Sequence, residues 1–288
     1  MKHKRKLYKL FLTVVLLTFG IIMIFPYIIM FFTALKAPDE IYTTDLRIFP
    51  EKWRWSNYVN ALKGGNWKIY FWNSAVITVV GTVSSVILNS MAGYAFAKVD
   101  FFLKKQLFAM LMLGLLIPTQ VILLPLFIII KNFPLAGGNN LRGIGGTGLV
   151  NSPWALLLPY MAGALGVFMC RQFYLSFPSS LDDAAQIDGC SRIRIFFQIY
   201  LPLSKPLLAS LSIIKMTFIW NDYAWPLVAL NTDEHKTVQL ALAAMKNTTV
   251  EWEKLMAMAM LTSLPVILVF IFAQKYFVAG IVSSGTKG

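Results

Sequence analysis

Residues 69–97, IYFWNSAVITVVGTVSSVILNSMAGYAFA, carry the clearest structural signal in the chain, because these 29 successive residues contain no charged side chain. A transmembrane helix needs about 20 predominantly apolar residues. The apolar residues here form a continuous run and do not alternate with period two, as they would in a membrane β-strand. The segment therefore predicts a helix that crosses a membrane.

Five further segments have the same character. Four contain no charge: 26 residues between Lys9 and Lys36, 25 between Lys105 and Lys131, 28 between Arg142 and Arg171, and 20 between Lys254 and Lys275. The fifth, roughly residues 206–230, is apolar apart from Lys215 and Asp222. We therefore predict an all-α integral membrane protein with six transmembrane helices.

The composition of the whole chain agrees with this prediction. Of its 288 residues, 57% are hydrophobic and 14% are charged, whereas a soluble domain has about 25% charged residues. This composition excludes an ordinary soluble enzyme and a disordered chain. The two cysteines in the sequence exclude a disulfide scaffold.

The distribution of charge predicts the orientation. Six spans place both termini on one side, and that side carries 14 basic and 4 acidic residues, against 11 basic and 8 acidic on the other. Basic residues favour cytoplasmic loops. We therefore expect cytoplasmic N- and C-termini, and we read the net charge of +13 as a topology signal that requires no nucleic acid partner.

These observations define the expected organisation of the chain. The first span follows a basic tail but is too long for a signal peptide and has no small-residue cleavage site after it, so we expect a retained anchor. The predicted parts are a cytoplasmic tail (1–9), the first span (10–35), an external loop (36–68), a transmembrane core (69–280) with a cytoplasmic loop at 177–206, and a cytoplasmic tail (281–288).

Motifs for catalysis are absent or out of context. The segment Gly143–Gly148 matches G-x-G-x-x-G, but it falls in a predicted external loop and not between a strand and a helix. His3 and His235 have no partners for a nucleophilic or metal site, and the Asn-Thr-Thr sequon at 247–249 is of a kind common by chance. We predict no catalytic residue, no metal ligand and no cofactor in this chain.

The cytoplasmic loop at 177–206, FPSSLDDAAQIDGCSRIRIFFQIYLPLSKP, is more elaborate than a connection requires. Its serines, three residues before aspartates, predict a capping box at the start of a short helix. Gly189 can end that helix in the left-handed conformation, and Ser191 can cap a second helix that ends near Pro202. Two short helices joined at a glycine form a protrusion suited to a partner's groove.

This loop resembles the coupling loop of bacterial ABC importer permeases. The family pattern is E-A-A, three residues, G, nine residues, I, one residue, L-P. Here Asp183-Ala184-Ala185, Gly189, Ile199 and Leu201-Pro202 have the same spacing, with Asp183 in place of glutamate. Four more segments resemble the carbohydrate subfamily, in particular its maltose-type second permease: 71–98, 116–127, 218–227 and the C-terminal QKYFVAGIVSSGTKG.

The resemblance implies the ABC type I importer permease fold and a place in a larger assembly. The chain would be a permease subunit of an ATP-driven importer of carbohydrate, chiefly oligosaccharide, in the bacterial inner membrane. Its partners would be a second, similar permease, a dimer of ATP-binding subunits that hold ATP and Mg²⁺, an extracytoplasmic solute-binding protein, the sugar and membrane lipid. The residues expected to couple it to the ATP-binding subunits are Asp182, Asp183, Ala184, Ala185, Asp188, Gly189, Ile199 and Pro202.

A second group of residues is a candidate for the substrate pathway. Lys215 and Asp222 are ionisable residues in a predicted span, and such residues usually face a cavity or a partner. Amide and aromatic side chains surround them, as a sugar site requires. The group comprises Asn73, Lys215, Trp220, Asn221, Asp222 and Tyr223. One alternative is that Lys215 pairs with a neighbouring helix and Asp222 lies at the outer interface. Another is that the aromatic residues form an interfacial belt and the asparagine bonds to another helix. A third is that the partner permease holds the sugar.

Two other classes of function compete with the importer hypothesis. A polytopic membrane enzyme, such as a glycosyl or lipid transferase, needs paired carboxylates or histidines near one interface, but the cytoplasmic acids cluster inside the coupling pattern. An ion-coupled secondary transporter predicts several buried acids and inverted repeats, and the sequence offers one acid near the end of a span and no visible repeat.

Overall fold

The computed structural model describes residues 2–43, 47–246 and 250–285, and within these ranges every regular element is helical. The sequon at 247–249 and the last residues of the predicted tail, 286–288, lie outside them. The helices are α1 (Lys2–Ala34), α2 (Pro38–Ile41), α3 (Ser56–Lys63), α4 (Trp67–Lys98), α5 (Lys104–Leu113), α6 (Thr119–Lys131), α7 (Pro153–Met161), α8 (Ala164–Leu175), α9 (Ser180–Ile187), α10 (Arg192–Ile195), the π-helical η1 (Phe196–Tyr200), α11 (Leu201–Leu203), α12 (Lys205–Asn221), α13 (Ala224–Ala229), the 3₁₀ turn η2 (Asp233–His235), α14 (Val238–Ala244) and α15 (Trp252–Gly285).

The prediction of an all-helical membrane protein is confirmed, whereas the number of spans stays a prediction. Four helical segments are long and apolar enough to cross a membrane: Lys6–Ala34, Trp67–Lys98, Pro153–Leu175 and Trp252–Gln274. A fifth is added if Arg192–Leu203 and Lys205–Asn221, which meet at an angle of 81°, count as one span. The remaining predicted span is divided between α5 and α6.

Glycine and proline account for that division. α5 ends before Gly114, and α6 begins after Pro118, which has an extended backbone with ψ of 136°. Proline has no amide hydrogen and keeps the preceding residue away from helical angles. The predicted single helix over 106–130 is therefore two helices, although Pro125 is accommodated within α6.

The chain forms two compact units, residues 1–67 with 241–265 and residues 68–240 with 266–288. In the first unit, the side chain of Asn57 on α3 donates hydrogen bonds to the carbonyls of Ala34 (3.0 Å) and Lys36 (2.8 Å). These bonds join α3 to the end of α1. Trp53 and Trp55 stack on each other beside the end of α1 and remain 52% and 57% exposed.

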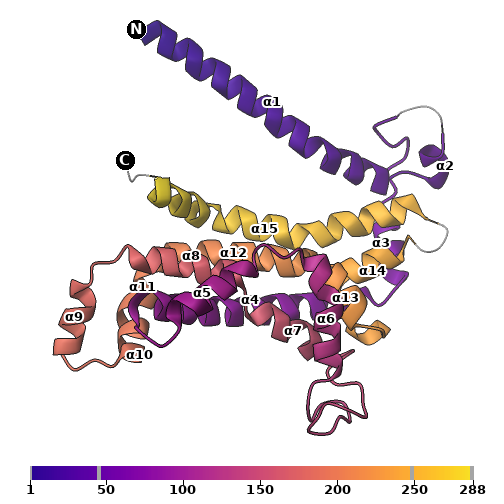
Figure 1. Ribbon diagram of the computed structural model, residues 1–288. Helices are drawn as coiled ribbons and strands as arrows, with labels where there is room; N and C mark the ends of the chain where they lie inside the picture. The colour runs from indigo at the N-terminus through magenta and orange to yellow at the C-terminus, as the bar shows by residue number, and fades with distance from the viewer. Residues whose placement is uncertain (1, 44–46, 247–249, 286–288) are drawn as a thin grey trace. The chain divides into compact units, whose positions relative to one another are not determined.

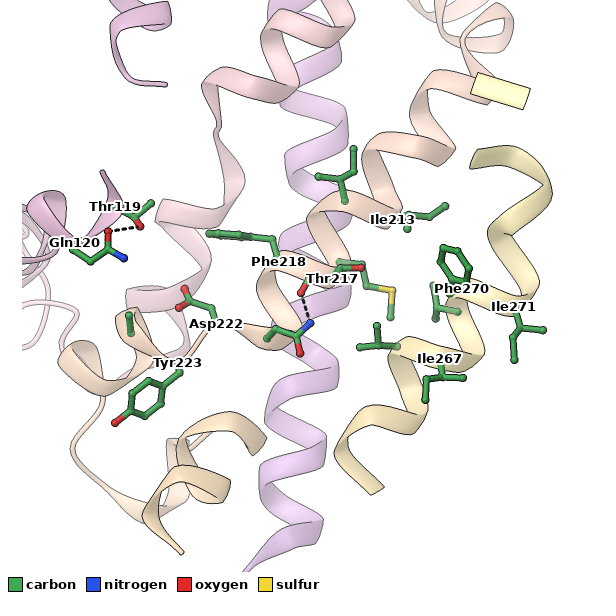
Figure 2. Close-up of a pocket in the computed structure, with 16 residues that line it drawn as sticks. Thr119, Gln120, Ile213, Thr217, Phe218, Asp222, Tyr223, Ile267, Phe270 and Ile271 are labelled. Carbon is green, nitrogen blue, oxygen red and sulfur yellow. Dashed lines mark hydrogen bonds between the residues drawn. The ribbon is translucent and has the colours of Figure 1, made fainter. Parts of the chain in front are cut away.

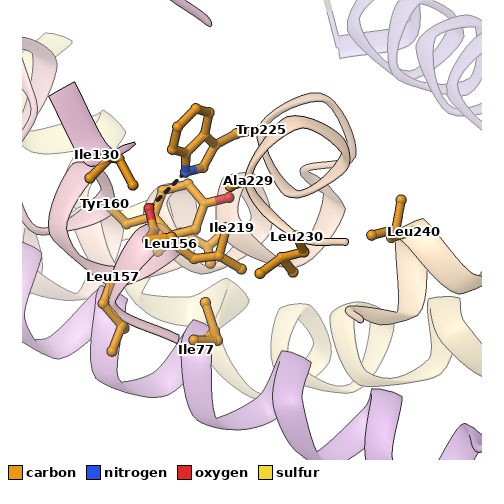
Figure 3. Packing of buried hydrophobic residues seen from close by; sticks show 11 residues of the cluster. Ile77, Ile130, Leu156, Leu157, Tyr160, Ile219, Trp225, Ala229, Leu230 and Leu240 are labelled. Atoms are coloured by element: carbon orange, nitrogen blue, oxygen red, sulfur yellow. Dashed lines mark hydrogen bonds between the residues drawn. The ribbon is translucent and has the colours of Figure 1, made fainter. Parts of the chain in front are cut away.

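The second unit has two buried cores. One contains Ile77, Ile130, Ala155, Leu156, Leu157, Tyr160, Ile219, Trp225, Ala229, Leu230 and Leu240 (Figure 3). Within it, the indole nitrogen of Trp225 donates to the carbonyl of Ala155 at 3.0 Å, so its polar group is satisfied. The other core contains Tyr94, Cys170, Tyr174, Ala185, Ile195, Phe196, Tyr200, Leu207 and Leu211.

Small residues bring α4 and α8 close together in this unit. A Cβ atom on Gly93 would overlap the Cβ of Cys170, and one on Gly166 would lie 2.6 Å from the side-chain nitrogen of Asn89. Asn89 in turn donates to the hydroxyl of Ser85 at 2.7 Å. Close backbone approach at glycine, with polar groups satisfied internally, is typical of packing between membrane helices.

The loop at 177–206 and the end of α12 both lie in the second unit. There, α9 and α10 occupy one end, and the loop that follows α6 occupies the other (Figure 1).

Candidate functional site

The loop at 177–206 has the two short helices predicted from its sequence. α9 ends at Ile187, and Gly189 follows in the left-handed conformation with a φ of +79°. A continuous helical segment then runs from Arg192 to Leu203 before the chain turns by 81° into α12. The loop therefore has a defined shape.

The two predicted helix caps had different outcomes. Ser191 precedes α10, and its hydroxyl accepts a hydrogen bond from the amide of Arg194 at 3.3 Å, which confirms the second cap. The predicted capping box of α9 is wrong, because Ser179 has helical backbone angles and its side chain makes no cap hydrogen bond. The carboxylate of Asp182, which would have shared that box, is turned into the protein.

Many residues of the loop are exposed. Of the predicted coupling residues, Asp183, Ala184, Asp188, Gly189 and Pro202 are exposed and Ile199 is half-buried, whereas Asp182 and Ala185 are buried. Two apolar residues outside the predicted coupling set, Ile187 and Ile193, are 86% and 69% exposed. We call Asp183, Ala184, Ile187 and Ile193 the coupling face. Its signal in the sequence is the pair of isoleucines on either side of Gly189.

Asp182 and Tyr200 join the two helices of the loop from inside. The Tyr200 hydroxyl donates a hydrogen bond to the Asp182 carboxylate. Lys98, at the end of α4, lies 3.6 Å from the same carboxylate, and Arg192 lies 3.8 Å from its other oxygen. A buried charge needs such partners to offset its desolvation.

A cavity of about 1020 Å³ lies beside α12. Three of the predicted pathway residues, Asn221, Asp222 and Tyr223, line its wall. Its wall also includes Thr119 and Gln120 at the start of α6. Apolar side chains of α15, including Ile267, Phe270 and Ile271, complete it (Figure 2). We call this cavity the α12 groove.

Asp222 is held at the edge of this groove. Its carboxylate accepts a hydrogen bond from the Tyr160 hydroxyl at 2.8 Å and another from the amide of Trp225 at 3.4 Å. It also borders a smaller cavity of about 170 Å³ with Gln120 and Tyr160. Tyr160 and Gln120 were not among the predicted pathway residues. The one sequence signal for Gln120 is that it is the single glutamine in the apolar segment 116–127.

Lys215 lies away from the groove and at the break between α7 and α8. Its ammonium group donates to the carbonyls of Tyr160 (3.3 Å) and Ala162 (3.2 Å), where the helix has ended and backbone donors are lacking. This geometry matches the alternative in which Lys215 pairs with a neighbouring helix.

The structure does not bring Asn73 and Trp220 to the groove either. Asn73 donates to the carbonyls of Glu234 (2.8 Å) and Lys236 (3.0 Å), so it holds the loop around η2. Trp220 is buried with its ring 6.4 Å from that of Phe71 on α4.

The glycine-rich segment 143–148 forms a compact loop. The amide of Gly146 donates to the Asn139 side chain at 2.7 Å, and the amide of Thr147 donates to the carbonyl of Gly137 at 3.0 Å. These amides are therefore not free to bind a phosphate group. Among the residues that the structure describes, no group of three His, Cys, Asp or Glu side chains could hold a metal ion.

A family model described as "Binding-protein-dependent transport system inner membrane component" matches residues 89–283, which include the coupling loop and the α12 groove. The chain belongs to this family. It is therefore a membrane subunit of a transport system and not an enzyme, and its location is the inner membrane.

Individual relatives agree with this assignment. The permease is 30% identical over 285 residues to the arabinooligosaccharides transport system permease protein AraQ of Bacillus subtilis, across 98% of this chain and 96% of that protein. It is 33% identical over 217 residues to the lactose transport system permease protein LacG of Rhizobium radiobacter, across 75% and 74%. A solved bacterial ABC transporter involved in the import of the acidic polysaccharide alginate has a chain with the same fold, with a TM-score of 0.77 at 21% identity, covering 94% of this chain and 97% of that chain.

Proposed function

We propose that this permease forms half of the translocation pathway of an ATP-driven carbohydrate importer and receives the motion of the ATP-binding subunits through its coupling loop. The observation that carries the proposal is the coupling face, a set of exposed residues on two short helices at one end of the second unit. A loop that only connected two spans would need no such surface. ATP and Mg²⁺ are held by the partner subunits.

Docking on the coupling face combines apolar burial with a polar contact. Ile187 and Ile193 present apolar side chains to solvent, and burial of an isoleucine stabilises an interface by about 1.5–3 kcal/mol. Ala184 is small enough to allow close approach of another backbone, and Asp183 supplies one charge beside it. A short helix that inserts into a groove of the partner uses these features.

Carbohydrate is the proposed substrate class, because sugar systems recur among the relatives and because the α12 groove has suitable chemistry. Asn221 and Gln120 supply amides, Asp222 supplies a carboxylate and Tyr223 supplies a ring. Sugars have hydroxyl groups for the polar side chains and apolar ring faces for the aromatic one. A second, similar permease supplies the other half of the pathway.

The proposed orientation places the coupling loop and both termini in the cytoplasm. The loop that follows α6 lies at the opposite end of the second unit (Figure 1). In the proposed orientation, this loop is on the side of the extracytoplasmic binding protein. The excess of basic residues on the side of the termini supports this orientation.

The test is co-purification from cells that express the permease with its genomic neighbours, followed by uptake assays with a panel of sugars. We expect an ATP-binding subunit to co-purify, and the variant Ala184→Trp to release it because the added ring blocks close approach. The matched control Leu141→Trp adds the same ring at the other end of the unit, at a residue that is 77% exposed, and should retain the partner. Failure of the unaltered permease to retain any ATP-binding subunit would overturn the proposal.

A further inference from the structure

Asp182 is a charged residue in a place where charge is costly. It lies on the inner side of α9 and is 5% exposed, although its neighbour Asp183 points to solvent. A buried carboxylate is tolerated only where ion pairs and hydrogen bonds replace its hydration. Its partners therefore identify what this residue connects.

Those partners come from two parts of the second unit, the end of α4 and the helical segment Arg192–Leu203. Lys98 ends α4 and lies 3.6 Å from the carboxylate, and it also donates to the carbonyl of Phe177 at 2.7 Å, before α9 begins. Arg192 opens α10 and lies 3.8 Å away. Tyr200 donates its hydroxyl from the segment that leads into α12. One carboxylate thus links α9 with the end of α4 and the approach to α12.

The local structure around Tyr200 is specialised for this link. Tyr200 ends the π-helical turn η1, in which one extra residue changes the direction of the side chains that follow. Its ring is fully buried, with ring centroids of Tyr94 at 4.8 Å, Phe177 at 5.4 Å and Tyr174 at 5.5 Å. Aromatic packing therefore fixes the position of the Tyr200 hydroxyl, which donates the hydrogen bond to the Asp182 carboxylate.

We propose that Asp182 is a positioning residue that fixes α9 to the end of α4 and to the helical segment Arg192–Leu203, which leads into α12, so that a displacement of the coupling face moves α4 and this segment. The inference rests on the proposed function, since it requires a partner that moves α9. If the carboxylate left Lys98 and Tyr200, two buried charges would lose their partner, which is costly, so α9 moves together with these residues.

The experiment uses the complete transporter in proteoliposomes and measures sugar uptake per ATP hydrolysed. Asp182→Asn keeps the size of the side chain and removes its charge, while Tyr200→Phe removes only the hydroxyl and keeps every charge. The matched control is Asp100→Asn, which removes an exposed carboxylate that pairs with Lys104 at 3.2 Å on the same side of the protein. We expect both test variants to retain the ATP-binding subunits and to lose uptake per ATP by about fivefold or more, the lower end of typical coupling between sites. The control should match the unaltered protein.

This ratio separates positioning from folding. A variant that only folds less well lowers uptake and ATP hydrolysis together and leaves their ratio unchanged. An unchanged ratio in both variants would therefore overturn the proposal, as would release of the ATP-binding subunits, which would make Asp182 a residue of the docking surface. If Asp182→Asn fails to insert, the ratio for Tyr200→Phe decides. If the unaltered permease retains no ATP-binding subunit, the proposed function fails instead.

Discussion

At the scale of single residues, Gly189 shows how one backbone conformation supports the coupling loop. Its φ of +79° is one that residues with a side chain rarely adopt, and an added Cβ would meet no atom within 4 Å. The glycine is therefore required for its backbone angles and not for lack of space. Without this turn, the chain could not leave α9 in the direction of α10.

Two substitutions at Gly189 test this interpretation. Left-handed backbone angles cost a residue with a side chain, such as the β-branched valine, about 1–2 kcal/mol. Asparagine adopts these angles more readily. We expect Gly189→Val to abolish sugar uptake by membrane vesicles while the chain still inserts at a normal level, and Gly189→Asn to retain most of the uptake. Normal uptake by the valine variant would contradict the role of the turn, and equal loss in both would show that the partner surface requires the glycine.

The residue scale also shows what can be predicted from sequence. Gly189 and Ser191 act on neighbouring backbone, so local rules identified them. Asp182 and Asp183 are adjacent and chemically identical, and which of them faces inward depends on Lys98 and Tyr200. These partners are distant in the sequence, so no local pattern could reveal that Asp182 is buried.

At the scale of helices, the breaks were harder to predict than the helices themselves. Uncharged runs reveal apolar length, but they do not show where a helix is interrupted. The break between α7 and α8 leaves carbonyl groups of Tyr160 and Ala162 without helical donors, and Lys215 on α12 supplies them. Because a membrane provides no water for such groups, a lysine in a span can be a structural requirement.

Substitution of Lys215 separates this structural role from a role in the pathway. Lys215→Met leaves two carbonyls without a donor, and we expect it to lower the free energy of unfolding by about 1–3 kcal/mol, measured by thermal unfolding in detergent. The relative uptake of different sugars should not change. Asp222→Asn, in the α12 groove, should instead change KM for the sugar with little effect on the unfolding temperature.

Lys205→Met is the matched control, because it removes an exposed lysine from the start of the same helix. It should leave both properties unchanged. An altered preference among sugars in Lys215→Met, with normal thermal stability, would assign Lys215 to the pathway and contradict the structural role.

At the scale of the whole molecule, the apolar runs predicted the fold class, and the resemblance of one loop predicted the family. The α12 groove could not be predicted, because it is assembled from α6, α12, α13 and α15. Of the pathway residues expected from one apolar segment, only those at the end of α12 reach it. A cavity depends on contacts between segments, which composition does not record.

The orientation of the molecule is the property that the sequence predicts through charge alone, and it can be measured directly. The background for this test replaces Cys170 and Cys190, the two free cysteines, with alanine and serine. Single cysteines then replace Leu141, which is 77% exposed after α6, or Ile187, which is 86% exposed on the coupling face. A membrane-impermeant maleimide should label Leu141→Cys from outside, and it should label Ile187→Cys only after the membrane is opened, in cells that express the permease alone.

The physical reason is the cost of moving basic residues across the membrane during insertion. The five basic residues before the first span make the N-terminus the more difficult end to translocate. Removal of four of them, by Lys2→Gln, Lys4→Gln, Arg5→Gln and Lys6→Gln, should therefore give a mixed labelling pattern, whereas Lys63→Gln, in the external loop, should not. If Ile187→Cys is labelled from outside while all the N-terminal basic residues are present, the orientation is the reverse of the predicted one. It would also place the coupling face on the side of the membrane where no ATP-binding subunit could reach it.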